Sequence, residues 1–503
     1  MSKARTIMFQ GTASDVGKSI ITTAVCRIFV QDGFKTAPYK SQNMALNSYV
    51  TLCGKEIGRA QGVQAEACGI TATTDMNPIL IKPTRDMTAQ VVVHGKPHAE
   101  MSARRYREEY LPIAGTIVRE ALDRLKSEYE VIVIEGAGSP AEINLKDRDI
   151  VNMRLAEWAD APVVLVADID RGGVFASIVG TLELLEEHER NRVKGFIINK
   201  FRGDIAILQP GLDWLEQRTG IPVLGVVPHL NGIDIEAEDS VALDHQADNL
   251  NPGADIDVAV IRLPRISNFT DTDPLAAEPD VQVRYVQSPE ELGHPDVILL
   301  PGTKNTLADL SFLRETGLAE AIRKKAESGT RLVGICGGYQ ILGARLSDPH
   351  QVESEEGEAA GLGFLPAETV FYTDKRTERV RGNVACNHPE WLELQGISVE
   401  GYEIHMGRTE KLEPAKGLFQ IGDHEDGMLS ADGRIWGTYL HGIFENDEFR
   451  RKWLNLIRQE KGLAPLETEI HFQNRKTAAF DRLADHARAH LDIDKIYRIA
   501  GLK

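Results

Sequence analysis

The sequence predicts an α/β protein of two domains, each built on a mostly parallel β-sheet covered by helices. Two observations indicate this fold class. The 503 residues exceed what one hydrophobic core ordinarily organises, so more than one domain is expected. Short apolar runs of strand length alternate with longer amphipathic stretches, which is typical of βαβ units whose sheet is covered on both faces.

The first domain is predicted over residues 1–232, as a doubly wound sheet. Its candidate strands span residues 6–10, 35–39, 131–135, 162–168, 193–199 and 223–228. Each is short and apolar, and helical patterns separate them. The order of these elements favours parallel pairing.

The character of the chain changes after Pro228. The segment HLNGIDIEAEDSVALDHQADNLNPGAD is acidic and rich in Asn, Gly and Pro, so residues 233–254 are predicted to be a linker. A second series of strands, at residues 256–263, 281–286, 297–300, 331–335 and 436–440, predicts another α/β domain over residues 255–450. Residues 451–503 are predicted to form a helical tail packed on one of the domains.

Composition narrows the classes of partner. The chain has 57 basic and 75 acidic residues, a net charge of −18, which disfavours nucleic acid. The apolar runs are of strand length, and the N-terminus carries no secretory pattern, so we expect a cytoplasmic protein without a membrane partner. Five scattered cysteines with no CxxC pair argue against a disulfide framework or a thiolate zinc site.

A phosphate loop is predicted directly after the first strand. The segment GTASDVGKS lies between that strand and an amphipathic run, so its backbone N–H groups and the helix start can cradle phosphate. Lys18 supplies a positive charge, and the Ser19 hydroxyl can ligate Mg²⁺. The residues expected to bind ATP here are Thr12, Ser14, Asp15, Val16, Gly17, Lys18 and Ser19.

This loop has Thr12 where the commonest phosphate loop has its first glycine. It resembles instead the GTxxxxGK[ST] loop of dethiobiotin synthetase and its relatives, which implies a P-loop NTPase-like fold. The resemblance implies that Glu135, at the end of VIVIEG, helps Ser19 to hold Mg²⁺. It also implies that Asn199, at the end of VKGFIINK, contacts the nucleotide base. ATP and Mg²⁺ are therefore expected to bind in the first domain.

The second domain carries a candidate nucleophile, Cys336. It follows an apolar strand and precedes a helical run within VGICGGYQ, the context of a nucleophile elbow. His441, at the end of WGTYLHG, is the predicted base, and His405 in GYEIHMGRT is a rival. The backbone of Gly302 in LPGT could complete an oxyanion hole.

The strings PGT, GICGGYQ and YLHG, in this order, resemble the triad-type glutamine amidotransferase domain. The resemblance implies a flavodoxin-like class I fold, L-glutamine as nitrogen donor, and a glutamine or oxyanion site that includes Gly302, Gly337 and Gln340. Most such domains carry Glu two positions after the histidine, where this chain has Ile443. The carboxylate that orients His441 is left unassigned, with Glu403 and Glu445 as weak candidates.

A phosphate loop followed by a glutaminase predicts an amide-forming ligase. ATP would activate a carboxylate, and ammonia from glutamine would displace the phosphate. Six further strings, SQNMALNS, AEINLKDRDIVNMRLA, DIDRGGVFAS, NKFRGD, LPGTKNT and GYEIHMGRT, resemble the cobyric acid synthase family over nearly the whole chain. This resemblance implies amidation of the b, d, e and g carboxylates of adenosylcobyrinic acid a,c-diamide to adenosylcobyric acid, in cobalamin biosynthesis.

A polycarboxylate corrinoid would need local basic groups in an acidic protein. Several basic side chains lie near the strings that carry the resemblance. The predicted substrate site comprises Lys40, Asn43, Lys146, Asp168 and Arg171.

Other functions remain open at this point. A cobyrinic acid a,c-diamide synthase or a peptidoglycan-amidating relative would share both activities. A ParA-like ATPase switch predicts a second lysine early in the phosphate loop, and residues 12–15 contain none. A non-catalytic corrinoid-binding module would leave the Cys336 elbow unexplained. The sequence leaves the oligomeric state undetermined.

Overall fold

The computed structural model describes residues 4–85, 87–230, 232, 234–236, 243, 251, 253–354, 357–413 and 416–503. The chain divides into two units. Unit 1 comprises Met1–Ala45, Glu56–Ile235 and Lys476–Lys503, and unit 2 comprises Leu46–Lys55 and Glu236–Arg475. Most of the predicted linker, residues 233–254, lies outside the described residues.

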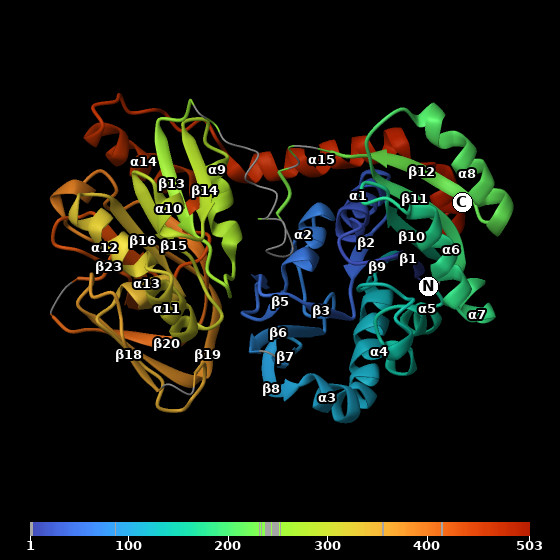
Figure 1. Cartoon of the computed structure of the whole chain (residues 1–503), viewed down its shortest axis with the longest axis horizontal. Helices are drawn as coiled ribbons and strands as arrows, with labels where there is room; N and C mark the ends of the chain where they lie inside the picture. The colour runs from blue at the N-terminus through green and yellow to red at the C-terminus, as the bar shows by residue number, and fades with distance from the viewer. Residues whose placement is uncertain are drawn as a thin grey trace. The chain divides into compact units, whose positions relative to one another are not determined.

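The six strands predicted for the first domain form one parallel sheet. They are β1 (Arg5–Gly11), β2 (Thr36–Tyr39), β9 (Val131–Glu135), β10 (Val163–Asp168), β11 (Val193–Phe201) and β12 (Val223–Pro228), in the order β12-β11-β10-β1-β9-β2 (Figure 1). The chain passes from β1 to strands on one side and later to strands on the other. Ligands bind where the strand order reverses in this way, so the carboxyl ends of β1 and β10 are the expected binding edge.

Helices cover both faces of this sheet. The apolar side chains of α1 (Lys18–Gln31) share a core cluster with those of α15 (Phe472–His490) and α16 (Ile493–Ala500), where the rings of Phe29 and Tyr497 stack at 5.4 Å. On the other face α4 (Leu111–Glu128) contacts β9, and α6 (Val174–Leu184) contacts β10. The remaining helices of unit 1 are α2 (Arg59–Ala67), α3 (Ala103–Arg105), η1 (Tyr106–Tyr110), η2 (Ile143–Arg148), α5 (Met153–Ala159), α7 (Glu187–Arg190) and α8 (Ile205–Thr219).

A second sheet in unit 1 was not predicted. Strands β3 (Gln42–Met44), β6 (Ile79–Arg85), β7 (Thr88–Val93) and β8 (Lys96–Ser102) pair in that order, and α3 and η1 follow β8 directly. These strands mix polar and apolar residues, because one face of the sheet is more buried than the other. A continuous apolar run, which reveals a strand buried on both faces, is therefore absent from this part of the sequence. Short strands β4 (Ser48–Val50) and β5 (Glu56–Gly58) also went unpredicted.

Unit 2 contains the predicted second parallel sheet. Strands β13 (Ile256–Ile261), β14 (Val281–Val286), β15 (Val297–Leu300), β16 (Arg331–Ile335) and β24 (Ile435–Thr438) lie in the order β14-β13-β15-β16-β24, with antiparallel β23 (Met428–Leu429) at the edge. This is the flavodoxin-like order of doubly wound sheets. The predicted α/β fold class is confirmed in both units.

A separate sheet in unit 2 is built on the long antiparallel strands β19 (Ala367–Val384) and β20 (Ser398–Lys411), which were not predicted. Its shorter strands are β17 (Arg345–Ser347), β18 (Glu358–Ala360), β21 (Phe419–Ile421) and β22 (His424–Asp426). The helices of unit 2 are η4 (Phe269–Thr272), α9 (Asp273–Ala276), α10 (Pro289–Leu292), α11 (Thr306–Glu315), α12 (Leu318–Glu327), α13 (Gly337–Leu342), η5 (Pro389–Trp391), η6 (Ile443–Glu445) and α14 (Asp447–Glu460).

Two segments group differently from the predicted boundaries. Leu46–Lys55 packs within unit 2 rather than with the rest of the first domain. The predicted tail, 451–503, is divided. Arg450 and Arg451 of α14 form buried ion pairs with Glu278 and Asp280, which tie this helix into unit 2, whereas Lys476–Lys503 joins unit 1. Within the described part of the chain, no helix combines the length and hydropathy required to span a bilayer.

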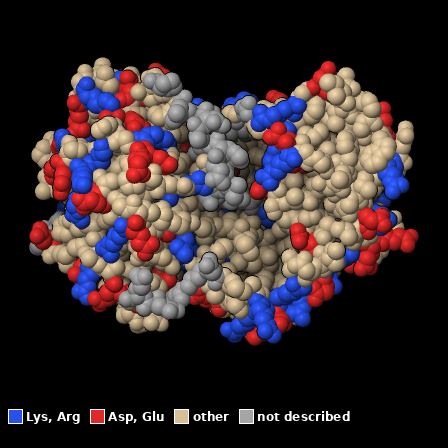
Figure 2. Space-filling view, viewed as in Figure 1, with Lys and Arg blue, Asp and Glu red and all other residues tan. Residues whose placement is uncertain are grey.

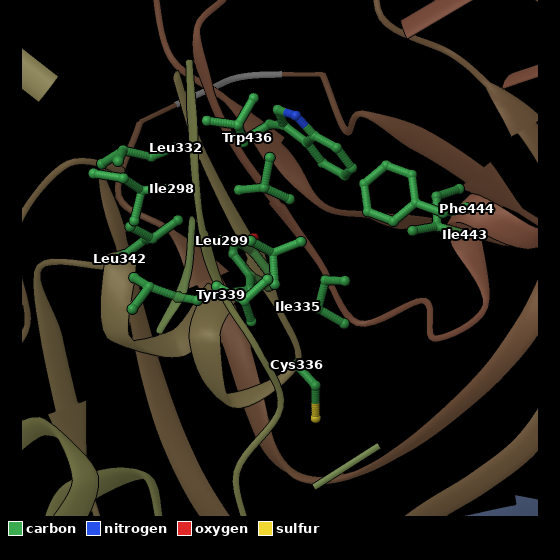
Figure 3. Packing of buried hydrophobic residues seen from close by; sticks show 14 of the residues in the cluster. Ile298, Leu299, Leu332, Ile335, Cys336, Tyr339, Leu342, Trp436, Ile443 and Phe444 are labelled. Carbon is green, nitrogen blue, oxygen red and sulfur yellow. The ribbon is translucent and has the colours of Figure 1, made fainter. Parts of the chain in front are cut away.

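An aromatic cluster forms the core of unit 2 beside β24. Trp436 is fully buried, and its ring lies 5.6–6.4 Å from five others, those of Trp391, Phe419, Phe444, Phe449 and Trp453. Figure 3 shows Trp436 and Phe444 among the packed side chains, and Cys336 where the strand before it ends. The cluster therefore fixes the strand that leads into His441.

We expect Trp436→Ala to lower the free energy of unfolding by about 3–5 kcal/mol, because it leaves a cavity in this cluster. Urea unfolding followed by circular dichroism would measure the change. The matched control is Leu392→Ala, since Leu392 is 58% exposed, and its effect should stay within about 0.5 kcal/mol. Equal effects of the two substitutions would show that the cluster is not a determinant of stability.

Candidate functional site

Cys336 occupies a sharp turn between β16 and α13. Its backbone has φ 53° and ψ −109°, a left-handed conformation that is rare for a residue with a side chain. Such strained residues cluster at active sites, where the surrounding structure holds them in place. The side chain is buried, and its Sγ donates a long hydrogen bond of 3.7 Å to the carbonyl of Ile404.

Glycines allow this turn to pack closely on the loop after β15. A Cβ on Gly338 would lie 1.9 Å from the carbonyl oxygen of Leu300, and one on Gly337 would lie 2.5 Å from the Thr303 side chain. A Cβ on Gly302 would lie 3.1 Å from Cε1 of His441. Since β15, β16 and β24 are neighbours, the loops at their carboxyl ends meet, and Gly302, Cys336 and His441 come together as the sequence predicted.

A carboxylate that the sequence did not identify orients His441. Nδ1 of the buried imidazole donates to Oδ2 of Asp271 at 2.6 Å, and the backbone N–H of Gly442 donates to the other carboxylate oxygen at 2.8 Å. The Tyr402 ring stacks on the imidazole at 5.1 Å. These contacts fix the ring with Nε2 as the remaining nitrogen, and Nε2 has no hydrogen-bond partner among the described residues.

Neither carboxylate suggested by the sequence occupies this position. Glu403 pairs with His424 at 3.2 Å and with Arg376 at 2.6 Å, and Glu445 accepts a hydrogen bond from Gln473. Asp271 precedes His441 by 170 residues and lies in the short helix η4. In most triad-type glutamine amidotransferases the orienting glutamate lies two positions after the histidine. A search near His441 in the sequence therefore could not find Asp271.

The surroundings of His441 favour its protonated form. Burial disfavours the imidazolium, but the charges of Asp271 and Cys336 and the hydrogen bond to Asp271 outweigh it and raise the pKa of His441 to about 10. The dependence on Cys336 indicates that the thiol and the imidazole interact.

The rival base, His405, has other contacts. Its ring stacks on Tyr439 at 3.8 Å, and its Nδ1 lies 2.7 Å from the carbonyl oxygen of Gly407. Both polar atoms of the Gln340 side chain are also engaged: Oε1 accepts from Thr306 at 2.9 Å, and Nε2 donates to the Tyr439 hydroxyl at 3.1 Å. Gln340 therefore supports the wall behind the elbow in this structure.

The segment Leu46–Lys55 builds part of the surroundings of this site within unit 2. The backbone N–H of Ser48 donates to the side chain of Asn268 at 2.9 Å, three residues before Asp271. Val50 belongs to an apolar cluster with Tyr402 and Ile404, and its carbonyl accepts from Arg379 at 2.8 Å. A segment from the first part of the sequence thus packs against residues that contact His441 and Cys336.

The phosphate loop has its predicted place between β1 and α1. Gly17 has φ 91°, and a Cβ there would lie 2.2 Å from Nδ2 of Asn199, so only glycine fits. Asn199 Nδ2 donates to the carbonyl of Val16 at 2.8 Å, which ties β11 to the loop. Lys18 Nζ donates to the carbonyls of Ala13 and Gly138 at 3.0 and 3.2 Å. The ammonium group thus crosses the loop at its phosphate-binding edge.

The outer part of the loop is held by residues of β10 and β11 and by Arg171, which follows β10. Thr12 N–H donates to the Val166 carbonyl at 3.0 Å, and Lys200 Nζ donates to the carbonyl of Asp15 at 2.5 Å. The same Lys200 ammonium lies 3.0 Å from Asp168, and Arg171 lies 3.8 Å from Asp15. The loop residues predicted to bind ATP, with Ser14 between Thr12 and Asp15, therefore form one continuous surface.

Glu135 is the centre of a buried polar cluster behind the loop. Its Oε1 accepts from Ser19 at 2.9 Å and from Lys40 at 2.9 Å, and its Oε2 accepts from Gln64 at 2.5 Å. Glu135 and Lys40 are both nearly inaccessible to solvent. A hydroxyl and a carboxylate oxygen 2.9 Å apart beside a phosphate loop fit the oxygen ligands that Mg²⁺ prefers.

The predicted substrate residues do not form one site. Lys40 pairs with Glu135, and Asn43 is buried and donates to Gln61 at 3.0 Å. Asp168 and Arg171 lie with Lys200 beside the phosphate loop. Lys146 alone of the five lines the large cavity of unit 1. Their nearness to the motif strings grouped these residues in the sequence, whereas the fold gives them four different surroundings.

We expect the stability of unit 2 to depend on pH through His441. Its folded pKa of about 10 lies above the ordinary value of 6.5, so its protonation stabilises the fold fully below pH 6.5, and this contribution disappears as pH rises through 10. The difference in unfolding free energy between the wild type and His441→Gln should therefore shrink from pH 6 to pH 10. Urea unfolding followed by tryptophan fluorescence measures it. A pH-independent difference would contradict the raised pKa.

Comparison with known proteins agrees with these two sites. Residues 7–241 match the CobQ/CobB/MinD/ParA nucleotide binding domain, and residues 257–449 match the CobB/CobQ-like glutamine amidotransferase domain. The cobyric acid synthase of Geobacillus sp. (strain WCH70) is 55% identical over 497 residues, which cover 99% of this chain and 98% of the relative. That of Desulforamulus reducens is 54% identical over 509 residues, with 100% and 99% coverage.

Among solved structures, PurLQS from Thermotoga maritima aligns with 41% of this chain and 99% of its own length, at 17% identity and a TM-score of 0.33. That low score adds nothing to the assignment, which rests on the full-length relatives and on the two domain matches. The chain belongs to the cobyric acid synthase family and is a glutamine-hydrolysing ligase that uses ATP.

Proposed function

We propose that this chain amidates the b, d, e and g carboxylates of adenosylcobyrinic acid a,c-diamide, with ATP and glutamine, to give adenosylcobyric acid in cobalamin biosynthesis. One observation carries the proposal: a phosphate loop backed by Glu135 and a Cys336–His441–Asp271 constellation occur in the same chain. The first makes an activated carboxylate and the second makes ammonia. The identity of the corrinoid is supported by the names of the full-length relatives.

Cys336, His441 and Asp271 would release ammonia from glutamine. The thiolate of Cys336 attacks the carboxamide carbon, and His441 gives its Nε2 proton to the departing ammonia, which leaves a thioester. Water then hydrolyses the thioester to glutamate, with His441 accepting the proton of the water. Backbone N–H groups at Gly302 and Gly337, the loop and helix start nearest the thiol, are the proposed oxyanion donors. Asp271 holds the imidazole and compensates its charge.

The phosphate loop would activate the substrate carboxylate. A carboxylate oxygen attacks the γ-phosphorus of ATP, the bond to ADP breaks, and an acyl phosphate forms. Ammonia then attacks the acyl carbon, and inorganic phosphate leaves. Lys18 would stabilise the charge on the phosphate oxygens. Ser19 and Glu135 would hold Mg²⁺, which neutralises phosphate charge when bound, and the buried Lys40 holds Glu135 in place.

The nucleotide base is proposed to lie beside Asn199. A cavity of 130 Å³ in unit 1 borders Gly17 and Asn199, and α15 contributes Leu483 and His486 to its wall. The Asn199 amide is held by the loop, so a base here would contact a preorganised surface. We assign the synthetase activity to the predicted domain 1–232 together with α15 and α16. We assign the glutaminase activity to the predicted domain 255–450.

The function is tested by incubating the chain with ATP, Mg²⁺ and adenosylcobyrinic acid a,c-diamide, and following products by mass spectrometry with either glutamine or ammonia. Wild type should add four amides from either nitrogen source. Cys336→Ala should lose glutamine-dependent synthesis and keep ammonia-dependent synthesis, whereas Lys18→Ala should lose both. A single new amide would favour another amidoligase, and amide formation by Lys18→Ala at the wild-type rate would refute the activating role of the loop.

A separate prediction concerns the carboxylate. Asp271→Asn should lower glutaminase kcat by about 10²–10⁴-fold, because the amide can still accept from Gly442 but no longer favours the imidazolium. Ammonia-dependent synthesis should be unchanged, which distinguishes this loss from misfolding. Glu445→Gln is the matched control and should retain activity. Glutaminase activity of Asp271→Asn within twofold of wild type would exclude Asp271 from catalysis.

A further inference from the structure

Unit 1 contains a large cavity that no predicted function accounts for. It measures 860 Å³, within the range of pockets that enclose most of a small-molecule ligand. Its wall comes from the unpredicted β3-β6-β7-β8 sheet, from α3 and η1, and from the segment between β9 and α5. Segments added to the doubly wound fold therefore form the cavity. It lies beside the carboxyl end of β9, in the parallel sheet that carries the phosphate loop.

The floor of the cavity is apolar. Ile81, Val91 and Met101 are buried side chains from three adjacent strands. At the edge, three large apolar side chains are exposed to solvent: Met44 is 61% exposed, Met87 82% and Leu145 49%. Exposed apolar residues grouped around a concavity mark ligand-binding surfaces. Methionine thioethers are also flexible, so such a surface can accommodate one ligand in several orientations.

The rim of the cavity is basic. It carries four cationic side chains, those of Arg104, Arg107, Lys146 and Arg148. Figure 2 shows Lys and Arg side chains gathered where Figure 1 places α3. These cations stand out in a chain with a net charge of −18.

Two of the acidic groups in the wall are already engaged. The Asp149 carboxylate accepts from the backbone N–H groups of Val151, Asn152 and Arg154 at 2.8–3.1 Å. Glu189 pairs with Lys146 at 2.6 Å. The third acidic group, Glu142, is exposed. Each rim cation also has a carboxylate neighbour: Glu108 for Arg104, Asp147 for Arg107 and Arg148, and Glu186 and Glu189 for Lys146. Exposed ion pairs of this kind contribute little, so the carboxylates of an anionic ligand can replace them at these cations.

One contact links the cavity to the phosphate loop. Gly138 lines the cavity, and its carbonyl oxygen accepts a hydrogen bond from Lys18 Nζ at 3.2 Å. A ligand that fills the cavity would therefore present an edge group close to the ammonium that binds the terminal phosphates. The apolar floor and the cationic rim belong to one cavity, and Gly138 in its wall connects that cavity to Lys18.

We infer that this cavity binds the corrin macrocycle of the substrate, with the ring face on the apolar floor and the carboxylates on the basic rim. The inference rests on the proposed function and names the site where that function acts. The carboxylate beside Gly138 is the one that is activated. Because the remaining carboxylates lie on the rim, release and rebinding in another orientation brings the next one to Lys18.

The test is direct binding of cobyrinic acid a,c-diamide, measured by equilibrium dialysis from the visible absorbance of the corrinoid. Ala89→Trp, which fills the cavity from β7, should raise Kd by about tenfold or more. Lys146→Gln should raise it by about tenfold at low salt, and less at high salt. Arg218→Gln, which removes an exposed cation on α8 away from the cavity, is the matched control and should bind like wild type.

Binding of an ATP analogue to each variant reports whether unit 1 is folded. If wild type converts the corrinoid, while Ala89→Trp and Lys146→Gln bind it with the wild-type Kd, the cavity is not the site and the proposed function stands. If wild type neither binds nor converts any corrinoid, the function and the site both fail. Weaker binding in both variants, with nucleotide affinity retained, supports the assignment.

Discussion

Both candidate sites depend on one constraint, which is that the strands of a parallel sheet all end at the same edge. In unit 1 the phosphate loop follows β1, Glu135 ends β9, Asp168 ends β10 and Asn199 lies near the end of β11. In unit 2, Gly302, Cys336 and His441 follow the neighbouring strands β15, β16 and β24. Residues far apart in the sequence thus meet without a long loop to carry them, and helices on both faces keep the strands in register.

Both sites contain buried carboxylates, and each carboxylate has hydrogen-bond or ion-pair partners next to it. Glu135 has a lysine, a serine and a glutamine around its two oxygens. Asp271 has the imidazole of His441 and a backbone N–H. Removing one partner of a buried pair leaves an uncompensated charge, which costs more than the pair contributes. Substitution of these groups can therefore destabilise the fold, so a test of their proposed roles needs a readout that separates stability from activity.

The chain passes from unit 1 into unit 2 directly after the strand β3. Met44 lines the cavity of unit 1, and two residues later the chain enters the segment Leu46–Lys55, which packs within unit 2 on residues that contact His441 and Cys336.

The sequence by itself determined the strands of both parallel sheets, the phosphate loop and the cysteine elbow, because each is encoded in consecutive residues: an apolar run, a glycine-rich turn and a helix start. Fully buried strands are near-continuous apolar runs, so β9, β15 and β16 were predicted to the residue. The partly buried edge strands β12 and β14 were also predicted to the residue. The tertiary structure alone decided the rest. Asp271 reaches His441 across 170 residues, the cavity wall comes from strands with mixed polarity, and α14 and α15 divide the C-terminal region between two units. These features depend on which surfaces meet after the chain has folded, and no local spacing in the sequence records that.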